Sequence, residues 1–589
     1  MEPRTEQRTE QRTGQRMEPG GTQRACSPIL FEKKSAIQRF GWGMLCLLLS
    51  AVLSACPSEQ ENTPGDDNVL DTDSQIILVN PANFEEFNRH ANTEEGSSKH
   101  YQLTDNIHLP SGTENNWTPI GTITNPFTGI FDGNGHTISG LNINSSGNFQ
   151  GLFGYIGSGA EIKNIGLVDS SVTGDNFVGG LVGWNNGGTL QGVYATGSVQ
   201  GNNTVGGLVG WNGSGTVQNC HVTGTVQGGN AVGGIVGGNF EGVVQNCYVT
   251  DNVQGKDGVG GIAGSNFQHS RVLNSHVTGN VQGTNGVGGI VGNNAQESTV
   301  QDCHTTGSVR GHDTVGGVVG SNFESTVQNC YARGNVTSTG RNVGGVVGLN
   351  NGKNSTLKTC YATGNIEGHE HVGGVVGMNV VATTQDCYAL GHVTGENDYV
   401  GGVTGTNNGL LKNCYATGSV RGGNHVGGIA GHNRQHSDSD GVARIEHCAA
   451  LNLSIQGTSY VGLAMGRRSG KDSISAIYSL CSPFERLPWF ILPCVGFNGI
   501  NGDYIWDHLD ELSKRLPALS TSPWSSQPNR LPGLFGQTIE MPAHLARCQF
   551  CDEYAPLLDA EGNVVLDANG HIVWGACIKY VWGPCWYKP

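Results

Sequence analysis

Nine aromatic or imidazole side chains recur along the middle of the sequence at intervals of 27 to 30 residues. They are Tyr194, His221, Tyr248, His276, His304, Tyr331, Tyr361, Tyr388 and Tyr415. Rings repeated in this way can bind sugar rings or a partner protein if they are exposed, and they can equally stack and stabilise a sheet. The stabilising role is the preferred interpretation, with ligand binding as the functional alternative. Trp184 and Trp211 share another variable position and are expected to extend such a platform.

The residue just before each ring belongs to a second row, which favours small apolar side chains. Its members are Ile165, Val193, Cys220, Cys247, Ser275, Cys303, Cys330, Cys360, Cys387, Cys414 and Cys448. The cysteines could bind a metal, but Ile and Val in the same position cannot, so we interpret the row as part of a core. Buried in a strand, it would leave the rings that follow it facing water. A few disulfides between neighbouring coils remain an alternative, because strands about 4.8 Å apart lie within the Cα range of a disulfide.

Residue types suited to metal binding or catalysis are present but are not grouped. His276 and His304 could together bind a metal, yet no further ligands accompany them, so we predict no metal site and no cofactor. A polysaccharide lyase or hydrolase, the catalytic alternative, would need acids and bases gathered on one strand face. The charged residues are instead scattered mainly over variable turns, at Lys256, Asp257, Arg271, Asp302, Arg310, Glu324 and Arg341. We therefore predict that the chain is not an enzyme.

The elements that position these rows are short strands in a tandem repeat. The tripeptide Val-Gly-Gly recurs every 26 to 29 residues, and no stretch inside a unit has the 3.6-residue period of a helix. The copies begin at Val178, Val205, Val232, Val259, Val287, Val315, Val343, Val372, Val400 and Val426. Apolar runs of three to five residues bounded by Gly and Asn predict about three strands per unit. Stacked in register, the units would form an all-β parallel β-helix, or β-solenoid, of about twelve 27–28-residue coils.

A third row consists of asparagines that follow the last Gly of each repeat core by two residues. It comprises Asn185, Asn212, Asn239, Asn266, Asn294, Asn322, Asn350, Asn379, Asn407 and Asn433. Asn tolerates the left-handed backbone region, and its side chain can bond to the Asn of the next coil, so this row is expected to fix a turn. The glycines that bound the strands are expected to allow positive φ at the coil corners.

The repeat core Val-Gly-Gly-Leu-Val-Gly at 205–210, with the continuation Asn-Cys-Tyr-Ala-Thr-Gly at 413–418, resembles the GLUG motif of bacterial surface proteins. The resemblance implies a right-handed β-helix over 149–470, an N-terminal cap over 75–148 and adhesin-like use at the cell surface. Similar repeats accompany some bacterial IgA-cleaving metallopeptidases, whose motif is His-Glu-x-x-His. The nearest string here, at 369–373, lacks the second His at the required spacing, so that activity is not expected.

The N-terminal region contains a signal for export and lipidation. Basic residues at Lys33, Lys34 and Arg39 precede an apolar run at 44–52 that is too short to span a bilayer, which is typical of a signal peptide. The following Leu-Ser-Ala-Cys resembles the bacterial lipobox, which implies cleavage before Cys56 and its modification with diacylglyceryl and fatty acyl (palmitate) chains. Residues 1–55 are therefore assigned to the leader and 56–74 to a flexible tether on the membrane. The predicted location is the outer membrane, with the chain on the cell surface.

The C-terminal region, 471–589, differs from the repeats in composition. Trp and Pro become frequent, and six cysteines appear: Cys481, Cys494, Cys548, Cys551, Cys577 and Cys585. In an oxidising compartment six cysteines favour disulfides over a zinc site, although their pairing cannot be deduced. A short helix is expected over 505–516. The region could close the solenoid or serve as a binding head.

The net negative charge of the chain limits the kinds of molecule that it is expected to bind. The whole chain has a net charge of −16, and the part after the leader is more acidic still, so nucleic acid is not an expected partner. The preferred function is a non-catalytic, adhesin-like surface lipoprotein that binds a glycan or protein ligand through the solenoid face or the C-terminal region. A passive spacer that presents the C-terminal region is the second alternative.

Overall fold

A computed structural model describes residues 70–110, 115–434, 443–469, 472–480, 503–506, 522–525, 530–540, 542, 547–556 and 574–584. All of them belong to one compact unit, Pro64–Pro589. The predicted leader, Cys56 and most of the tether lie outside the described residues. Within the described part of the chain, no helix is both long enough and apolar enough to cross a membrane.

Most repeats form one coil of four or five short strands joined by tight corners, whereas the coil that begins at Glu370 has three, because β43 (Val376–Ala389) is continuous. The coil that begins at residue 203 contains β14 (Asn203–Gly206), β15 (Val209–Gly213), β16 (Thr216–Gln218) and β17 (His221–Gln227). In later coils the last of these is divided in two. The strands are therefore shorter and more numerous than the three per unit that the sequence predicts.

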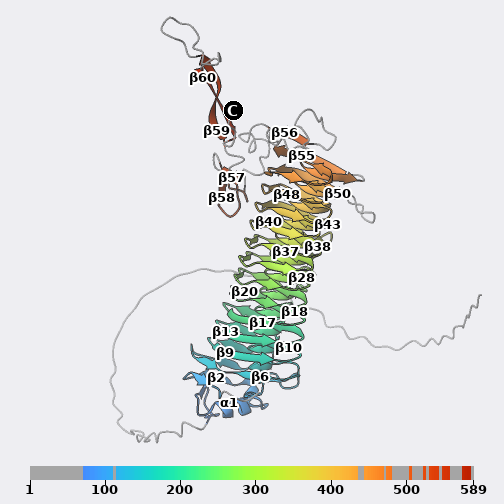
Figure 1. Ribbon diagram of the computed structural model, residues 1–589. Coiled ribbons are helices and arrows are strands. Elements are labelled where there is room, and N and C mark those ends of the chain that lie inside the picture. The colour runs from blue at the N-terminus through green and yellow to red at the C-terminus, as the bar shows by residue number, and fades with distance from the viewer. Residues whose placement is uncertain are drawn as a thin grey trace, which may run out of the picture. The chain divides into compact units, whose positions relative to one another are not determined.

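Successive coils pair strand on equivalent strand, in parallel and in register. Val205 lies opposite Val232 of the next coil, and His221 lies opposite Tyr248. Eleven strands of the β14 type form one continuous sheet, from β10 (Asn176–Gly179) to β53 (Ser459–Gly462). The coils stack along one axis from the α1 end to β55 (Figure 1), in about 13 turns. The parallel β-solenoid predicted from the repeats is confirmed.

The solenoid begins with a short helix and coils that precede the repeats. Within residues 75–148, β1 (Ile77–Val79), β2 (His100–Leu103) and β4 (Ile130–Asp132) already pair in parallel, and β4 continues onto β8 (Glu161–Lys163). Helix α1 (Phe84–Ala91) is followed by the 3-10 turn η1 (Gly96–Ser98).

The helix closes the first coil with aromatic side chains. The ring of Phe87 lies 4.8 Å from that of Tyr101 and 5.2 Å from that of Phe131, measured between centroids. Because the apolar face of α1 covers the first strands, the open end of the core is removed from water.

Parallel stacking continues beyond residue 470. Strand β55 (Asp472–Leu480) pairs with β51 (Ala443–Ala450), and β56 (Asp503–Trp506) pairs with β55. The short helix predicted over 505–516 is therefore wrong at its first two residues, which extend the stack as strand. Two antiparallel pairs follow: β57 (Arg530–Pro532) with β58 (Thr538–Glu540), and β59 (Arg547–Pro556) with β60 (Trp574–Pro584).

The interior of the solenoid contains the predicted cysteine row. Every cysteine from Cys220 to Cys448 in that row is buried, and all eight are free thiols, so no inter-coil disulfide forms among them. Each of the eight thiols donates a hydrogen bond to the backbone carbonyl two residues earlier, as Cys330 does to Gln328 at 3.1 Å. Ser275 occupies the same position and donates in the same way to Leu273, at 2.7 Å. The row is therefore structural.

The asparagine row is fully buried and bonded from coil to coil. Asn266 donates through Nδ2 to Oδ1 of Asn294 at 2.8 Å, and Asn294 donates to Asn322 at 2.8 Å. The predicted ladder is present, but these residues lie in extended strands. Positive φ occurs elsewhere, at a second row of corner residues such as Asn219 (φ 55°) and Asn246 (φ 55°).

Glycine in the Val-Gly-Gly tripeptide is required for close packing and not for positive φ. A Cβ on Gly206 would lie 2.0 Å from the carbonyl oxygen of Val209. The residue just before the tripeptide has positive φ instead, as at Thr204 (φ 58°), even though it is usually not glycine. Glycine itself supplies positive φ at this corner in two coils, at Gly258 (φ 63°) and Gly286 (φ 61°), and other residue types supply it in the rest.

Candidate binding surface on the solenoid

The ring row forms one continuous stack on the β17 side of the solenoid, which we call the ring stripe. Its members are Tyr194, His221, Tyr248, His276, His304, Tyr331, Tyr361, Tyr388 and Tyr415. Neighbouring ring centroids are 4.6 to 5.2 Å apart, and neighbouring planes differ by 3 to 11°. Because aromatic pairs by themselves prefer offset or edge-on arrangements, the in-register backbone must impose this parallel geometry.

Stacking decides which part of each ring is free to bind. A sugar packs against the face of an aromatic ring, but both faces of an inner ring in this stripe are covered by its neighbours. What remains accessible is the outer edge, with the tyrosine hydroxyls and the imidazole nitrogens. The stripe therefore offers edge contacts and hydrogen bonds in place of a row of open faces.

The imidazoles of the stripe are held in the neutral form. Partial burial lowers the pKa of His221, His276 and His304 below the usual value, and for His304 the nearby His276 and Arg333 lower it further. A neutral imidazole can both donate and accept a hydrogen bond at neutral pH. The imidazoles therefore contribute hydrogen-bonding groups to the stripe and not positive charge.

The stripe is open at one end and covered at the other. The six rings from Tyr194 to Tyr331 are half-buried, whereas Tyr361, Tyr388 and Tyr415 are buried. They are covered by part of the chain that we call the docked segment, namely the described residues of 522–540, which include β57 and β58. Its side chains of Trp524, Leu531 and Leu534 form a small core with the three tyrosines.

Two hydrogen bonds fix the docked segment on the stripe. The hydroxyl of Tyr415 donates to the carbonyl oxygen of Pro532, at 2.5 Å. The indole Nε1 of Trp524 donates to Oδ1 of Asp386 at 3.4 Å, and the same oxygen accepts from Asn413 at 2.8 Å. The stripe thus binds an apolar segment through ring edges, one hydroxyl and one carboxylate.

The two tryptophans at 184 and 211 belong to a different surface. They face each other across β11 (Val182–Asn186) and β15, with ring centroids 5.3 Å apart. Trp184 also contacts Tyr155 and Phe177, at 5.9 and 4.8 Å. Because the two tryptophans contact each other and neighbouring rings outside the stripe, they do not extend it.

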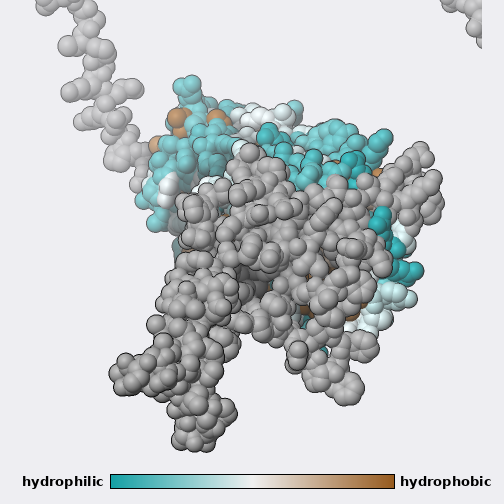
Figure 2. Space-filling model, turned by 90° about the horizontal axis from the view of Figure 1, so that it is seen from above, coloured by the Kyte–Doolittle hydropathy of each residue, from teal (hydrophilic) through white to brown (hydrophobic). Residues whose placement is uncertain are grey.

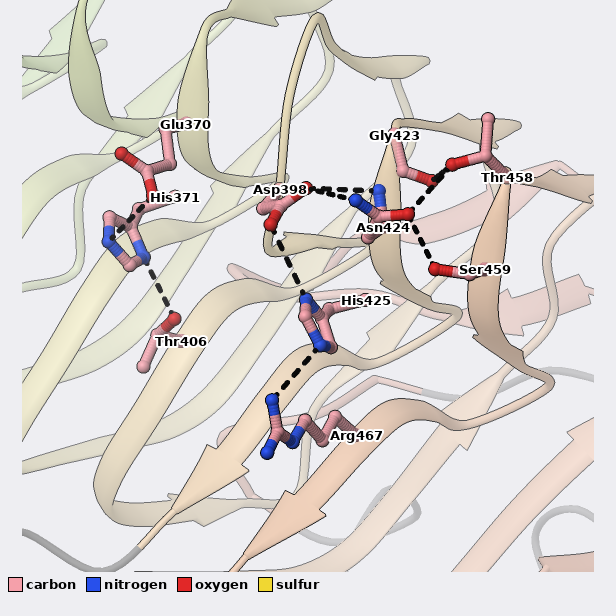
Figure 3. A network of polar contacts seen from close by, with 10 residues as sticks. All are labelled: Glu370, His371, Asp398, Thr406, Gly423, Asn424, His425, Thr458, Ser459 and Arg467. Carbon is pink, nitrogen blue, oxygen red and sulfur yellow. Dashed lines mark hydrogen bonds and ion pairs between the residues drawn. The ribbon is translucent and has the colours of Figure 1, made fainter.

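A polar cluster, which we call the corner cluster, lies at the corners that precede the Val-Gly-Gly tripeptides (Figure 3). At its centre four rings form a stack with centroids 4.8 to 4.9 Å apart: His371, Tyr399, His425 and Tyr460. The imidazole of His371 is 2.9 Å from the hydroxyl of Thr406, and His425 is 3.7 Å from the Asp398 carboxylate.

Burial dominates the electrostatics of this corner cluster. Burial, and after it nearby arginines with Arg434 first among them, lowers the pKa of His371 and of the neighbouring His432 to about 4. Among the described residues, no group of three or more His, Cys, Asp or Glu side chains is placed to hold a metal ion. The cluster is therefore an array of stacked rings whose histidines favour the neutral form.

The cysteines predicted to form disulfides lie mostly beyond the described side chains. Cys481, Cys494 and Cys585 fall outside the described residues, while the backbone places Cys548 and Cys551 on β59 and Cys577 on β60. In the described register, Cys548 lies opposite Gly583, Cys551 opposite Tyr580, and Cys577 opposite Tyr554.

The sequence alone missed the residues that cover the stripe. Trp524, Pro532 and Leu534 lie in a Pro-rich stretch with no repeat pattern, and nothing in their spacing connects them to the stripe. One signal was present: from Tyr331 onward every ring of the stripe is tyrosine, and three of these four are the covered ones.

Comparison with known families identifies the repeat unit. Residues 201–227, 228–254 and 311–337 match the family described as the GLUG motif. The chain carries GLUG repeats. Each matched GLUG repeat begins at the end of the last strand of one coil and ends in the last strand of the next, at β17, β22 (Val253–Gln254) or β37 (Val336–Ser338), so the family unit corresponds to one coil.

Two curated proteins are similar to part of the chain. Halomucin from Haloquadratum walsbyi is 42% identical over 106 residues, which is 17% of this chain and 1% of that protein. A protein named "Putative Gly-rich membrane protein" from Evansella cellulosilytica is 38% identical over 107 residues, 17% of this chain and 12% of that protein. The chain thus spans only a small part of the length of either relative.

One solved structure is similar at low identity. The crystal structure of a putative immunoglobulin A1 protease from Bacteroides ovatus is 22% identical, with a TM-score of 0.31. The match covers 46% of this chain and 79% of that chain.

Proposed function

We propose that this chain is a non-catalytic bacterial surface protein that binds a ligand through the ring stripe of its GLUG-repeat solenoid. The observation that supports the proposal is the docked segment, an apolar part of the chain that packs on the stripe. Trp524, Leu531 and Leu534 are almost completely buried against three of its tyrosines. The six rings that precede them are half-buried and continue the same stack.

A surface location supports this role. The lipobox at Cys56 predicts an acyl anchor in the outer membrane, and one relative of the repeats is named as a membrane protein. On the part of the molecule seen in Figure 2, the described surface is mainly hydrophilic, with few hydrophobic patches. On such a surface, an apolar or aromatic ligand would bind only where rings are accessible, as they are along the stripe.

The proposal is tested by binding of the purified chain to arrays of glycans and of extracellular matrix proteins. The stripe variant His276→Ala/His304→Ala should lose any binding that the wild-type chain shows. Asn230→Ala, at an exposed position in another strand type, should keep it. Equal binding by both variants would show that the stripe is not the binding surface. The proposal would be rejected if the chain bound to no array and gene deletion left cell attachment unchanged.

A passive spacer is the second candidate, favoured by the register of the coils. Deleting residues 201–254 removes two matched repeats and leaves like residues facing like residues across the junction. For a spacer, this deletion should change the reach of the C-terminal region from the membrane and leave every affinity unchanged.

A further inference from the structure

The covered end of the stripe defines how an indole is recognised. Trp524 lies against the edges of Tyr388 and Tyr415, with ring centroids 5.9 and 5.7 Å away. Its Nε1 donates to Asp386, which sits at the corner two residues before Tyr388. The recognition unit is therefore a corner aspartate followed by two stacked rings of successive coils.

The same unit occurs a second time, three coils closer to the N-terminus. Asp302 occupies the corner position of Asp386, and both have φ of 55°. Oδ1 of Asp302 accepts from Asn329 of the next coil at 3.0 Å, just as Asp386 accepts from Asn413 at 2.8 Å. These are the two aspartates of the corner row, whose other members are Asn164, Gly192, Asn219, Asn246, Asn274, Asn329, Thr359, Asn413 and His447.

The rings that follow Asp302 also correspond. His304 and Tyr331 take the places of Tyr388 and Tyr415, with centroids 4.7 Å apart and planes 11° from parallel. Asp302 is exposed, and both rings are only half-buried. The second unit thus has a carboxylate that can accept a hydrogen bond and a pair of ring edges, and both are accessible.

The docked segment makes this second unit part of a larger apolar surface. Phe535 lies 5.9 Å from the ring of Tyr361 and 6.2 Å from that of Tyr331, and it is 41% exposed although it is a large hydrophobic side chain. The guanidinium of Arg333 lies 5.0 Å from the centre of the Tyr331 ring. An apolar segment bound at Asp302 would therefore continue an interface that already exists.

We propose that Asp302, His304 and Tyr331 form a second docking site, which takes an indole-bearing, leucine-rich segment of a partner protein with the chemistry of the docked segment. This inference rests on the proposed function, in which the stripe binds a ligand, and it names the ligand class as polypeptide. A sugar is disfavoured because the ring faces are covered by neighbouring rings. An indole gains apolar contact with the ring edges while its N–H reaches the carboxylate.

The test uses a fluorescently labelled synthetic peptide with the sequence of residues 522–540, added to the full-length chain, whose own segment stays in place. We expect saturable binding that weakens about tenfold in His304→Ala, because an anchoring ring is lost. A smaller loss is expected in Asp302→Asn, which removes the charge but keeps a residue type that is native to this corner row. His269→Ala is the control, an exposed imidazole outside the ring stripe, and it should leave the affinity unchanged.

Several outcomes would overturn the inference. They are equal weakening by His269→Ala and His304→Ala, equal binding of a peptide carrying Trp524→Ala, and displacement of the peptide by oligosaccharides. Self-association of the chain that His304→Ala abolishes would instead assign the site to a second copy and reject a separate partner. If the peptide does not bind but array binding depends on His304, the proposed function stands and this inference fails. If the peptide binds as expected but array binding and cell attachment do not need the stripe, the docking site stands and a role of the stripe in attachment is rejected.

Discussion

The hydroxyl of Tyr415 donates a hydrogen bond of 2.5 Å to the carbonyl oxygen of Pro532, a residue 117 positions further along the chain. Tyr415 is the last ring of the stripe, and Pro532 ends strand β57. Both groups are removed from water by Trp524 and Leu531. This bond therefore joins the repeat array to a segment that has no repeat of its own.

Tyr415→Phe should loosen the docked segment without unfolding the solenoid. The substitution keeps the ring and its stacking but leaves the buried carbonyl of Pro532 without its donor, which costs about 1 to 3 kcal/mol. Limited proteolysis should therefore cut within 522–540 faster in the variant. Tyr248→Phe, at an open ring, is the control and should not change the rate of cleavage. Equal cleavage rates in the wild-type chain and Tyr415→Phe would contradict the assigned role of this bond.

Asn294→Ala should strongly destabilise the array. The side chain of Asn294 accepts from Asn266 and donates to Asn322, so its removal takes the donor from the buried Oδ1 of Asn322 and leaves Asn266 with only a longer bond to the Ser270 carbonyl and a weak one to that of Thr299. We expect a loss of about 3 kcal/mol, seen as a lower urea midpoint in circular dichroism. Asn230 makes a similar bond to Asn203 at 2.7 Å but is exposed. Asn230→Ala should therefore change the midpoint little, and a comparable drop in both variants would argue against burial as the cause.

Gly206→Ala should disrupt packing between two coils. The added methyl carbon would lie 2.0 Å from the carbonyl oxygen of Val209 and 2.7 Å from the amide nitrogen of Gly237, and backbone atoms cannot move aside easily. The expected cost is about 3 kcal/mol or more, measured as a lower Tm or loss of soluble protein. Gly213→Ala is the control, since its nearest neighbour would be the Trp211 Nε1 at 3.2 Å. A Tm for Gly206→Ala equal to that of the control would refute close approach as the reason for this glycine.

Acidification should destabilise the C-terminal coils through His371 and His432. Their pKa is about 4 in the folded chain, against 6.5 for an unperturbed histidine, so between these values the unfolded chain binds more protons. Stability is therefore fully present above pH 6.5 and declines as the pH falls toward 4, by about 3 kcal/mol per residue.

Urea midpoints measured from pH 7.5 to 4 should reveal this decline. The double variant His371→Asn/His432→Asn is the control, because Asn342 and Asn293 occupy the same positions in other coils. It should have a flatter profile over this range. A profile that is as steep in the double variant as in the wild-type chain would assign the acid sensitivity to other groups.

The sequence was sufficient for features that repeat from coil to coil. Val205, Asn212 and Cys220 each recur with one spacing, and identical spacing requires that like residues meet when coils stack. The buried thiols and the asparagine ladder followed from that argument alone. The number of strands per coil did not, because short strands and tight corners have the same composition.

Features that occur once could not be inferred in this way. The position of the docked segment depends on contacts such as that between Trp524 and Asp386, which are far apart in sequence and have no pattern in common. The corner rows were also misassigned. Thr204 and Asn219 adopt positive φ because the closed coil forces the chain to turn there, whatever the residue's own preference.

The in-register pairing of the coils has a genetic consequence. Recombination between neighbouring repeats removes or adds a whole coil, and after either event Val still meets Val and Asn still meets Asn. Such changes in copy number therefore produce folded chains in one step, whereas a break inside a unit would shift every later residue to the wrong face. Coils before Asp302 can be gained or lost without altering either aspartate corner, so close variants of this protein are expected to differ in repeat number mainly there.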